Sequence, residues 1–172
     1  MRKTFLAVAA VAVVAAIAVS VASGAASTRR IAVLDDCDTA SFDAVLGEGA
    51  CVKDGSVTFD EFIGQLLTMG RAPAWRFAPE QAKLEAGGSL VAANRGGEFH
   101  TLTEVAAFGG GCVPELNALL GLIPVPECMT PGIFFTTGIP AGGTLVTGPL
   151  AAGTHRFLCL IHPWMRATVE VA

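Results

Sequence analysis

Short segments in which apolar and polar residues alternate fill the chain from about residue 73 to its end. Such alternation is typical of half-buried β-strands, and turns rich in Gly and Pro separate the segments. We expect strands at residues 74–77, 81–86, 89–94, 99–105, 133–137, 144–146, 154–160 and 166–171. Many short strands with such turns predict an all-β fold, an antiparallel β-sandwich.

One clear helix is predicted before these strands. Thr58 and Glu61 have the spacing of a capping box, and Gly70 suits the C-terminal end of the helix. Apolar residues between them share one face at helical spacing, namely Phe59, Phe62, Ile63, Leu66 and Leu67. We expect the flank of the sandwich to cover this face, with a redox partner as the alternative.

The most apolar stretch is at the N-terminus. Arg2 and Lys3 precede an apolar run over residues 5–19, and small residues continue to Ala26. This order is that of a secretory signal peptide, residues 1–26. The run is short for a membrane span, which needs about 20 apolar residues, although an uncleaved anchor is the alternative. We expect a secreted or extracytoplasmic protein, in the periplasm or at the cell surface, with no membrane span after cleavage.

Charge and length limit the possible partners and the number of domains. Without the signal peptide, 9 basic residues stand against 15 acidic ones, a net charge near −6. There is no basic patch, so nucleic acid is excluded as a partner. The remaining chain is long enough for one domain at residues 72–172 and an N-terminal extension at residues 27–71 with a disulfide loop and a short helix. In that extension we interpret Asp35, Asp36 and Asp38 as a solvated loop rather than a cation site.

The candidate chemistry lies near the C-terminus. Cys159, His162 and Met165 occur within seven residues at the end of the strand expected at residues 154–160. A thiolate with imidazole selects copper over hard cations, and two His, one Cys and a weak axial Met form a blue-copper electron-transfer site. The loop therefore needs one more histidine from elsewhere in the chain.

Two histidines are available for that position. His155 lies four residues before Cys159 on the same strand, so about 13 Å separates them at about 3.3 Å per residue, too far to share a metal. His100 follows a turn containing Gly and begins another alternating run, from which it can reach across the sandwich. We assign His100, Cys159 and His162 as strong ligands and Met165 as the axial ligand.

These ligands belong to a longer pattern: Gly88, Leu90, Asn94 and His100, followed by Cys159-x-x-His162-Pro163-Trp164-Met165. The pattern resembles the type 1 copper site of cupredoxins, and the short loop is most similar to the amicyanin and plastocyanin-like branch. The resemblance covers about residues 72–172 and implies a Greek-key β-sandwich with one copper ion. The family often has Asn directly after the first His, where this chain has Thr101, whose hydroxyl can form a similar hydrogen bond.

The cysteine count agrees with a thiolate ligand. In an oxidising compartment cysteines pair, and the chain has five. If Cys159 binds copper, four remain, and these allow three connectivities. We expect local pairing of Cys37 with Cys51 and of Cys112 with Cys128, each closing a loop of about 15 residues worth roughly 3 kcal/mol. Residues 109–130, which break the strand pattern, would then form a rim near the copper, with a short helix beginning at Pro114.

The expected function is that of an electron shuttle, because ligands fixed by a sandwich and a tight loop keep one geometry in both copper oxidation states. Pro163 and Trp164 would form the apolar surface beside His162 through which a redox partner protein makes a small, weak contact. We expect a monomer.

Features that catalytic copper proteins need are missing from the sequence. Multicopper oxidases and copper nitrite reductases relay electrons through a His beside the thiolate ligand, whereas Leu158 and Leu160 flank Cys159. We therefore expect no catalysis. The alternatives are an exported copper carrier or storage protein, and a cell-surface interaction module that keeps only the sandwich.

Overall fold

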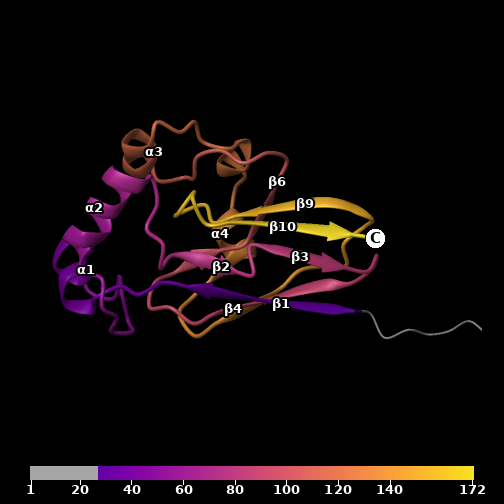
Figure 1. Cartoon of the computed structure of the whole chain (residues 1–172), viewed down its shortest axis with the longest axis horizontal. Helices are drawn as coiled ribbons and strands as arrows, with labels where there is room; N and C mark the ends of the chain where they lie inside the picture. The colour runs from indigo at the N-terminus through magenta and orange to yellow at the C-terminus, as the bar shows by residue number, and fades with distance from the viewer. Residues whose placement is uncertain (1–26) are drawn as a thin grey trace, which may run out of the picture.

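The alternating segments form two layers of β-sheet (Figure 1). The computed structural model describes residues 27–172, so the predicted signal peptide lies outside the described residues. In spatial order, the first sheet contains β2 (Arg76–Ala78), β1 (Thr28–Leu34), β4 (Ser89–Asn94) and β8 (Thr144–Val146). The second contains β3 (Gln81–Leu84), β10 (Arg166–Val171), β9 (Gly153–Leu158) and β6 (Thr103–Val105). A third sheet pairs β5 (His100–Thr101) with β7 (Gly138–Ile139).

The core lies between the two main sheets. Every second residue of β4 and of β10 is buried, including Leu90, Ala92, Ala167 and Val169, as expected for strands with one inner face. A β-sandwich is therefore confirmed.

The sheets are mixed rather than antiparallel, which corrects the sequence-based expectation. β1 runs parallel to β4, and β3 runs parallel to β10. The first sheet also includes residues 28–34, which were expected to lie in a separate extension. The first half of β1 is exposed, and only Ile31 and Val33 are buried, so its alternation is too short to identify the strand from the sequence.

Three helices lie at one end of the sandwich, near the loop that joins β9 to β10 (Figure 1): α1 (Thr39–Leu46), α2 (Phe59–Met69) and α3 (Pro114–Leu120). The predicted capping box of α2 is confirmed, since Glu61 N donates to Thr58 Oγ1 at 3.3 Å and Thr58 N donates to Glu61 Oε2 at 2.9 Å. Gly70 ends α2 with φ 68°. None of the helices within residues 27–172 is long and apolar enough to cross a membrane.

The strand predicted at residues 133–137 is wrong, because this segment is the short helix α4 (Ile133–Thr137). Its β-branched and aromatic residues favour a strand by propensity. However, the segment lies at the surface, where Phe135 is 95% exposed, and strand pairing begins only after it, at Gly138 of β7. The Thr137 hydroxyl instead donates to the Ile133 carbonyl at 2.7 Å, within one helical turn.

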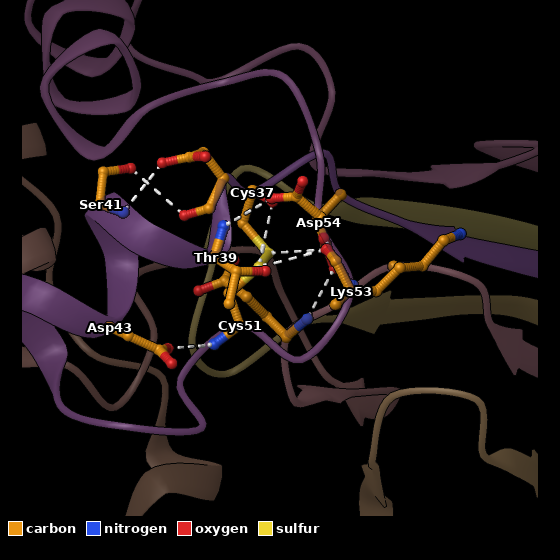
Figure 2. Close-up of a disulfide and its surroundings, with 12 residues drawn as sticks. Cys37, Thr39, Ser41, Asp43, Cys51, Lys53 and Asp54 are labelled. Atoms are coloured by element: carbon orange, nitrogen blue, oxygen red, sulfur yellow. Dashed lines mark hydrogen bonds between the residues drawn. A yellow bond between two sulfur atoms is a disulfide. The ribbon is translucent and has the colours of Figure 1, made fainter.

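The structure contains both disulfides expected from the sequence. Cys37–Cys51 links the start of α1 to the loop after it, where the Cys51 amide donates to Asp43 Oδ1 at 3.1 Å (Figure 2). Cys112–Cys128 closes the insertion that carries α3 and the 3₁₀ helix η1 (Pro126–Met129).

Candidate metal centre

The predicted ligands come from two places in the fold. His100 begins β5, whereas Cys159, His162 and Met165 lie in the loop between β9 and β10. This loop is closed by two backbone hydrogen bonds, from Cys159 N to the Met165 carbonyl at 3.1 Å and from Met165 N to the His162 carbonyl at 2.8 Å. These two hydrogen bonds hold the backbone of Cys159, His162 and Met165 in one closed turn.

Three donor atoms converge there. The Nδ1 atoms of His100 and His162 are 3.2 Å apart, and each lies 3.8 Å from Cys159 Sγ. A metal bonded at about 2.0–2.1 Å to nitrogen and about 2.3 Å to sulfur separates such donors by roughly 3.1–3.8 Å at angles of about 100–120°. The three donors fit one soft or borderline metal ion.

The site is shielded from water. Cys159 and His100 are fully buried, His162 is 3% exposed and Met165 is 1% exposed. Met165 belongs to the same apolar core cluster as Cys159, and its backbone is bonded to both loop ligands. Met165 is therefore buried in the same loop as Cys159 and His162.

The histidines favour the thiolate form of the cysteine. Burial alone would raise the pKa of Cys159, but hydrogen bonds and positive charge from His100 and His162 hold this pKa well below its usual range. A deprotonated sulfur is the form that binds metals.

A residue missed by the sequence analysis supports His100 from behind. Asp35 Oδ2 lies 2.7 Å from His100 Nε2, and its side chain is 1% exposed, which corrects the expectation of a solvated loop. Backbone amides of Gly97 and Glu98 donate to the same carboxylate at 2.8 and 3.2 Å. Burial would raise the pKa of Asp35, but the His100 and backbone hydrogen bonds lower it below its ordinary value.

The same contact acts on the histidine. Burial opposes protonation of His100, yet its hydrogen bonds to Asp35 and Cys159 raise its pKa to about 9. When a metal takes Nδ1, the carboxylate on Nε2 fixes the tautomer and strengthens the imidazole as a donor. Only recognition of β1 as a sandwich strand could have placed Asp35 here.

His162 also faces a buried carboxylate, but at a longer distance. Glu98 Oε2 lies 3.6 Å from His162 Nε2 and accepts a hydrogen bond from Trp75 Nε1. Burial, the largest influence, raises the pKa of Glu98. Asn94, part of the pattern noted in the sequence, holds this turn because its side-chain amide donates to the Glu98 carbonyl at 2.7 Å.

Thr101 joins the strand to the ligand loop. Its hydroxyl accepts a hydrogen bond from Leu160 N at 2.8 Å, and its own amide points at Cys159 Sγ at 3.4 Å. A hydrogen bond between the Thr101 hydroxyl and the loop is expected from the sequence, and the contact with Leu160 N is such a bond.

Each disulfide touches the surroundings of the centre. A Cβ added to Gly97 would lie 2.8 and 2.9 Å from the sulfurs of Cys37 and Cys51, so this disulfide packs beneath the backbone that binds Asp35. Cys112 N donates to the Leu160 carbonyl at 2.5 Å, which ties the insertion to the ligand loop. The expected rim around the site thus has a direct contact with it.

The remaining predicted residues lie outside the donor cluster. His155 pairs instead with Glu104 at 2.6 Å. Of the two residues predicted to contact a partner, Pro163 is buried and Trp164 is half-buried, so Trp164 is the one with exposed surface. The Phe62 ring of α2 packs edge-on against His162, with ring centroids 6.3 Å apart. The apolar face of α2 is therefore covered in part by the metal loop itself.

No family model and no curated protein matches the chain. Among solved structures, the chain is similar to a purple cupredoxin from Nitrosopumilus maritimus, at 15% identity over 62% of this chain and 90% of that one, TM-score 0.41. A mutant of amicyanin in its reduced Cu(I) form is 19% identical over 59% and 77%, TM-score 0.38. A mutant plastocyanin of fern is 12% identical over 84% and 100%, TM-score 0.41. At this level of similarity, function has to be argued from the side chains.

Proposed function

We propose that the protein is an exported mononuclear type 1 copper protein that shuttles electrons by cycling between Cu(I) and Cu(II). The observation that carries the proposal is the convergence of His100 Nδ1, His162 Nδ1 and Cys159 Sγ in a buried site, at separations that suit one metal ion. This donor set, with Met165 as the weak axial ligand, selects copper. Copper would supply the one-electron chemistry, and the chain would hold its ligands.

The rigidity of the donors favours a shuttle over the alternative, an exported copper carrier or storage protein. Hydrogen bonds from His100 to Asp35 and from Leu160 to Thr101, together with the closed loop, hold the donors in place before any metal binds. A site preorganised in this way changes little between oxidation states. A carrier that delivers copper needs exposed ligands, whereas these are buried.

The proposal includes the fold family and the setting inferred from the sequence. The domain would be a Greek-key cupredoxin, released from its signal peptide into the periplasm or to the cell surface. It would act as a monomer that exchanges electrons with an unidentified redox protein, without catalysis of its own. Trp164, beside His162, would contribute to the contact with that protein.

The direct test is a visible absorption spectrum of the mature protein with one equivalent of Cu(II), followed by ascorbate. We expect an intense blue band that bleaches on reduction and returns on oxidation. Cys159→Ser should abolish the band while the fold survives. As a matched pair, His100→Gln should lose the band and His155→Gln should keep it.

Two results would contradict the shuttle. A colourless protein that still binds Cu(I) tightly would indicate the carrier, and a protein that binds no copper would indicate an interaction module. A blue band retained in Cys159→Ser would show that the thiolate assignment is wrong.

The axial role of Met165 has its own test. Met165→Leu should keep copper and raise the reduction potential, because a weak axial donor that stabilises Cu(II) is lost. Met129→Leu is the matched control, since Met129 is 85% exposed and lies outside the loop. An unchanged potential in Met165→Leu would rule out the thioether as a ligand.

A further inference from the structure

A recessed pocket of about 420 Å³ opens between α1, α2 and α3 and reaches His162. Its walls are mainly apolar and include Phe42, Phe59, Phe62, Ile63, Leu116 and Ile161. Its volume lies in the range of about 300–1,000 Å³ that is usual for small-molecule sites. The electron-shuttle function proposed above makes no use of this pocket.

Three of the wall residues form an aromatic cluster. The rings of Phe42 and Phe59 meet edge-on with centroids 5.3 Å apart, and those of Phe42 and Phe62 with centroids 5.5 Å apart. Aromatic walls in such arrangements bind a further ring through edge-to-face and offset contacts. The shape and composition of the walls therefore suit a planar ring.

One polar group at the inner end of the pocket is incompletely used. Glu98 lines the pocket, its side chain is 9% exposed, and Oε2 makes both of its side-chain contacts, to Trp75 and His162. No hydrogen bond to Oε1 of Glu98 occurs within residues 27–172. Glu98 Oε1 is not among the fully buried polar atoms without a partner, so it keeps contact with solvent, and a donor group on a ligand could replace water there.

We propose that this pocket binds a small neutral aromatic alcohol of the phenol class. The ring would lie among the phenylalanines, and the hydroxyl would donate to Glu98 Oε1. An anion is disfavoured because the charged lining residues are Glu98 and Glu115. A cation is disfavoured because it would lose its hydration among apolar walls, whereas a hydroxyl loses little.

The test is a titration of the full mature chain, without added metal, with four probes followed by NMR: phenol, benzene, benzylamine and benzoate. We expect saturable shifts at the amides of Phe62, Ile161 and Glu98 with phenol. Phenol should bind about tenfold more tightly than benzene, the gain of one hydrogen bond to a charged group. Benzylamine and benzoate should bind more weakly than phenol.

Two tryptophan variants on α2 test the location. Ile63→Trp enlarges a half-buried wall residue and should reduce phenol binding at least tenfold. Leu67→Trp places the same side chain on the same helix at a position that is 65% exposed and outside the pocket, and it should leave binding unchanged. Unfolding curves of both variants show whether the fold is intact.

Several outcomes would overturn the proposal: no saturable shifts with phenol, equal affinities for phenol and benzene, tighter binding of benzylamine, or phenol binding that survives Ile63→Trp. Binding is measured without metal, so the result is independent of the proposed electron transfer. A chain that binds phenol but never turns blue with copper would contradict the electron shuttle alone.

Discussion

The two histidines of the donor cluster are supported in different ways. His100 is fully buried on a strand, and a carboxylate held by two backbone amides lies 2.7 Å from its Nε2. His162 lies in a loop, its carboxylate neighbour is 3.6 Å away, and it borders an apolar pocket. The His100 side of the centre is held by the buried Asp35 carboxylate, while the His162 side is covered by side chains of α2 such as Phe62.

The difference suggests a division of roles. A strong contact between Asp35 and His100 fixes the position and basicity of that donor, so the His100 side should determine how tightly the metal is held. The looser contact between Glu98 and His162 leaves the other imidazole adjustable. The His162 side should therefore matter less for affinity and more for what approaches the centre.

The largest expected effect comes from disturbing the backbone beneath Asp35. In Gly97→Ala the new Cβ would lie 2.7–2.9 Å from the Lys53 carbonyl and the two disulfide sulfurs, all of them closely packed. We expect a loss of about 1–3 kcal/mol in the free energy of unfolding, the usual cost of overpacking, together with weaker copper binding. Denaturant unfolding and copper titration measure the two effects.

A helix glycine provides the control for this substitution. Gly64 in α2 has nothing within 4 Å of the added Cβ, so Gly64→Ala should stabilise the protein by about 0.5–1 kcal/mol. If Gly97→Ala were equally harmless, the backbone there would not be the rigid support of the His100 side.

The next largest effect distinguishes Asp35 from the neighbouring Asp36. Asp35→Asn keeps the shape but removes the charge behind His100, so we expect about a 10–100-fold loss in Cu(II) affinity, the usual range for outer partners of metal ligands. The reduction potential should rise, because the lost carboxylate favours Cu(II). Competition with a chelator and voltammetry measure these changes. Asp36→Asn, whose carboxylate instead contacts Ser56, should change neither quantity.

Glu98→Gln should have a smaller effect than Asp35→Asn in the same measurements. Its oxygen lies beyond hydrogen-bonding distance of His162, and Gln can still accept the hydrogen bond from Trp75. We expect less than a tenfold change in Cu(II) affinity. Equal losses in the two variants would show that both sides of the centre are held alike.

The smallest effect concerns His155, the third histidine paired with a carboxylate, which lies outside the centre. A hydrogen bond to the Ala151 carbonyl at 2.9 Å, followed by the contact with Glu104, raises the pKa of His155. The protonated form is therefore stabilised on folding, fully below about pH 6.5, and this stability is lost as pH rises through the higher folded pKa. His155→Gln should lower Tm by about 2 °C or less at pH 6 and by less at pH 9. An identical difference at both pH values would contradict this account.

Local patterns in the sequence identified the loop that carries Cys159, His162 and Met165, most strands and the capped helix, because spacing between nearby residues encodes each of them. The side chains of Cys159, His162 and Met165 lie in one loop, so their spacing already implies a common site. His100 could be selected only because His155 was too far along the same strand.

The parts that could not be predicted depend on contacts between distant segments. Asp35 is 65 residues from His100 in the sequence. Asp35 reaches His100 because β1 pairs with β4, and this pairing brings residue 35 beside the turn before His100. Nothing in the local sequence distinguishes Asp35 from Asp36. The opposite error occurred at residues 133–137, where local propensity indicated a strand but strand pairing begins only at the next residue, Gly138.

The position of Asp35 has a consequence for protein engineering. If the Cys159–Met165 loop were grafted onto another β-sandwich, three of the four proposed ligands would be transferred, but the carboxylate behind His100 would stay in the donor protein. A graft that also carried the turn at residues 94–100 would still lack Asp35, which arrives on a separate strand. Transplanting this centre therefore requires three segments of chain, and a chimera built from the loop alone would be expected to bind copper with altered affinity and potential.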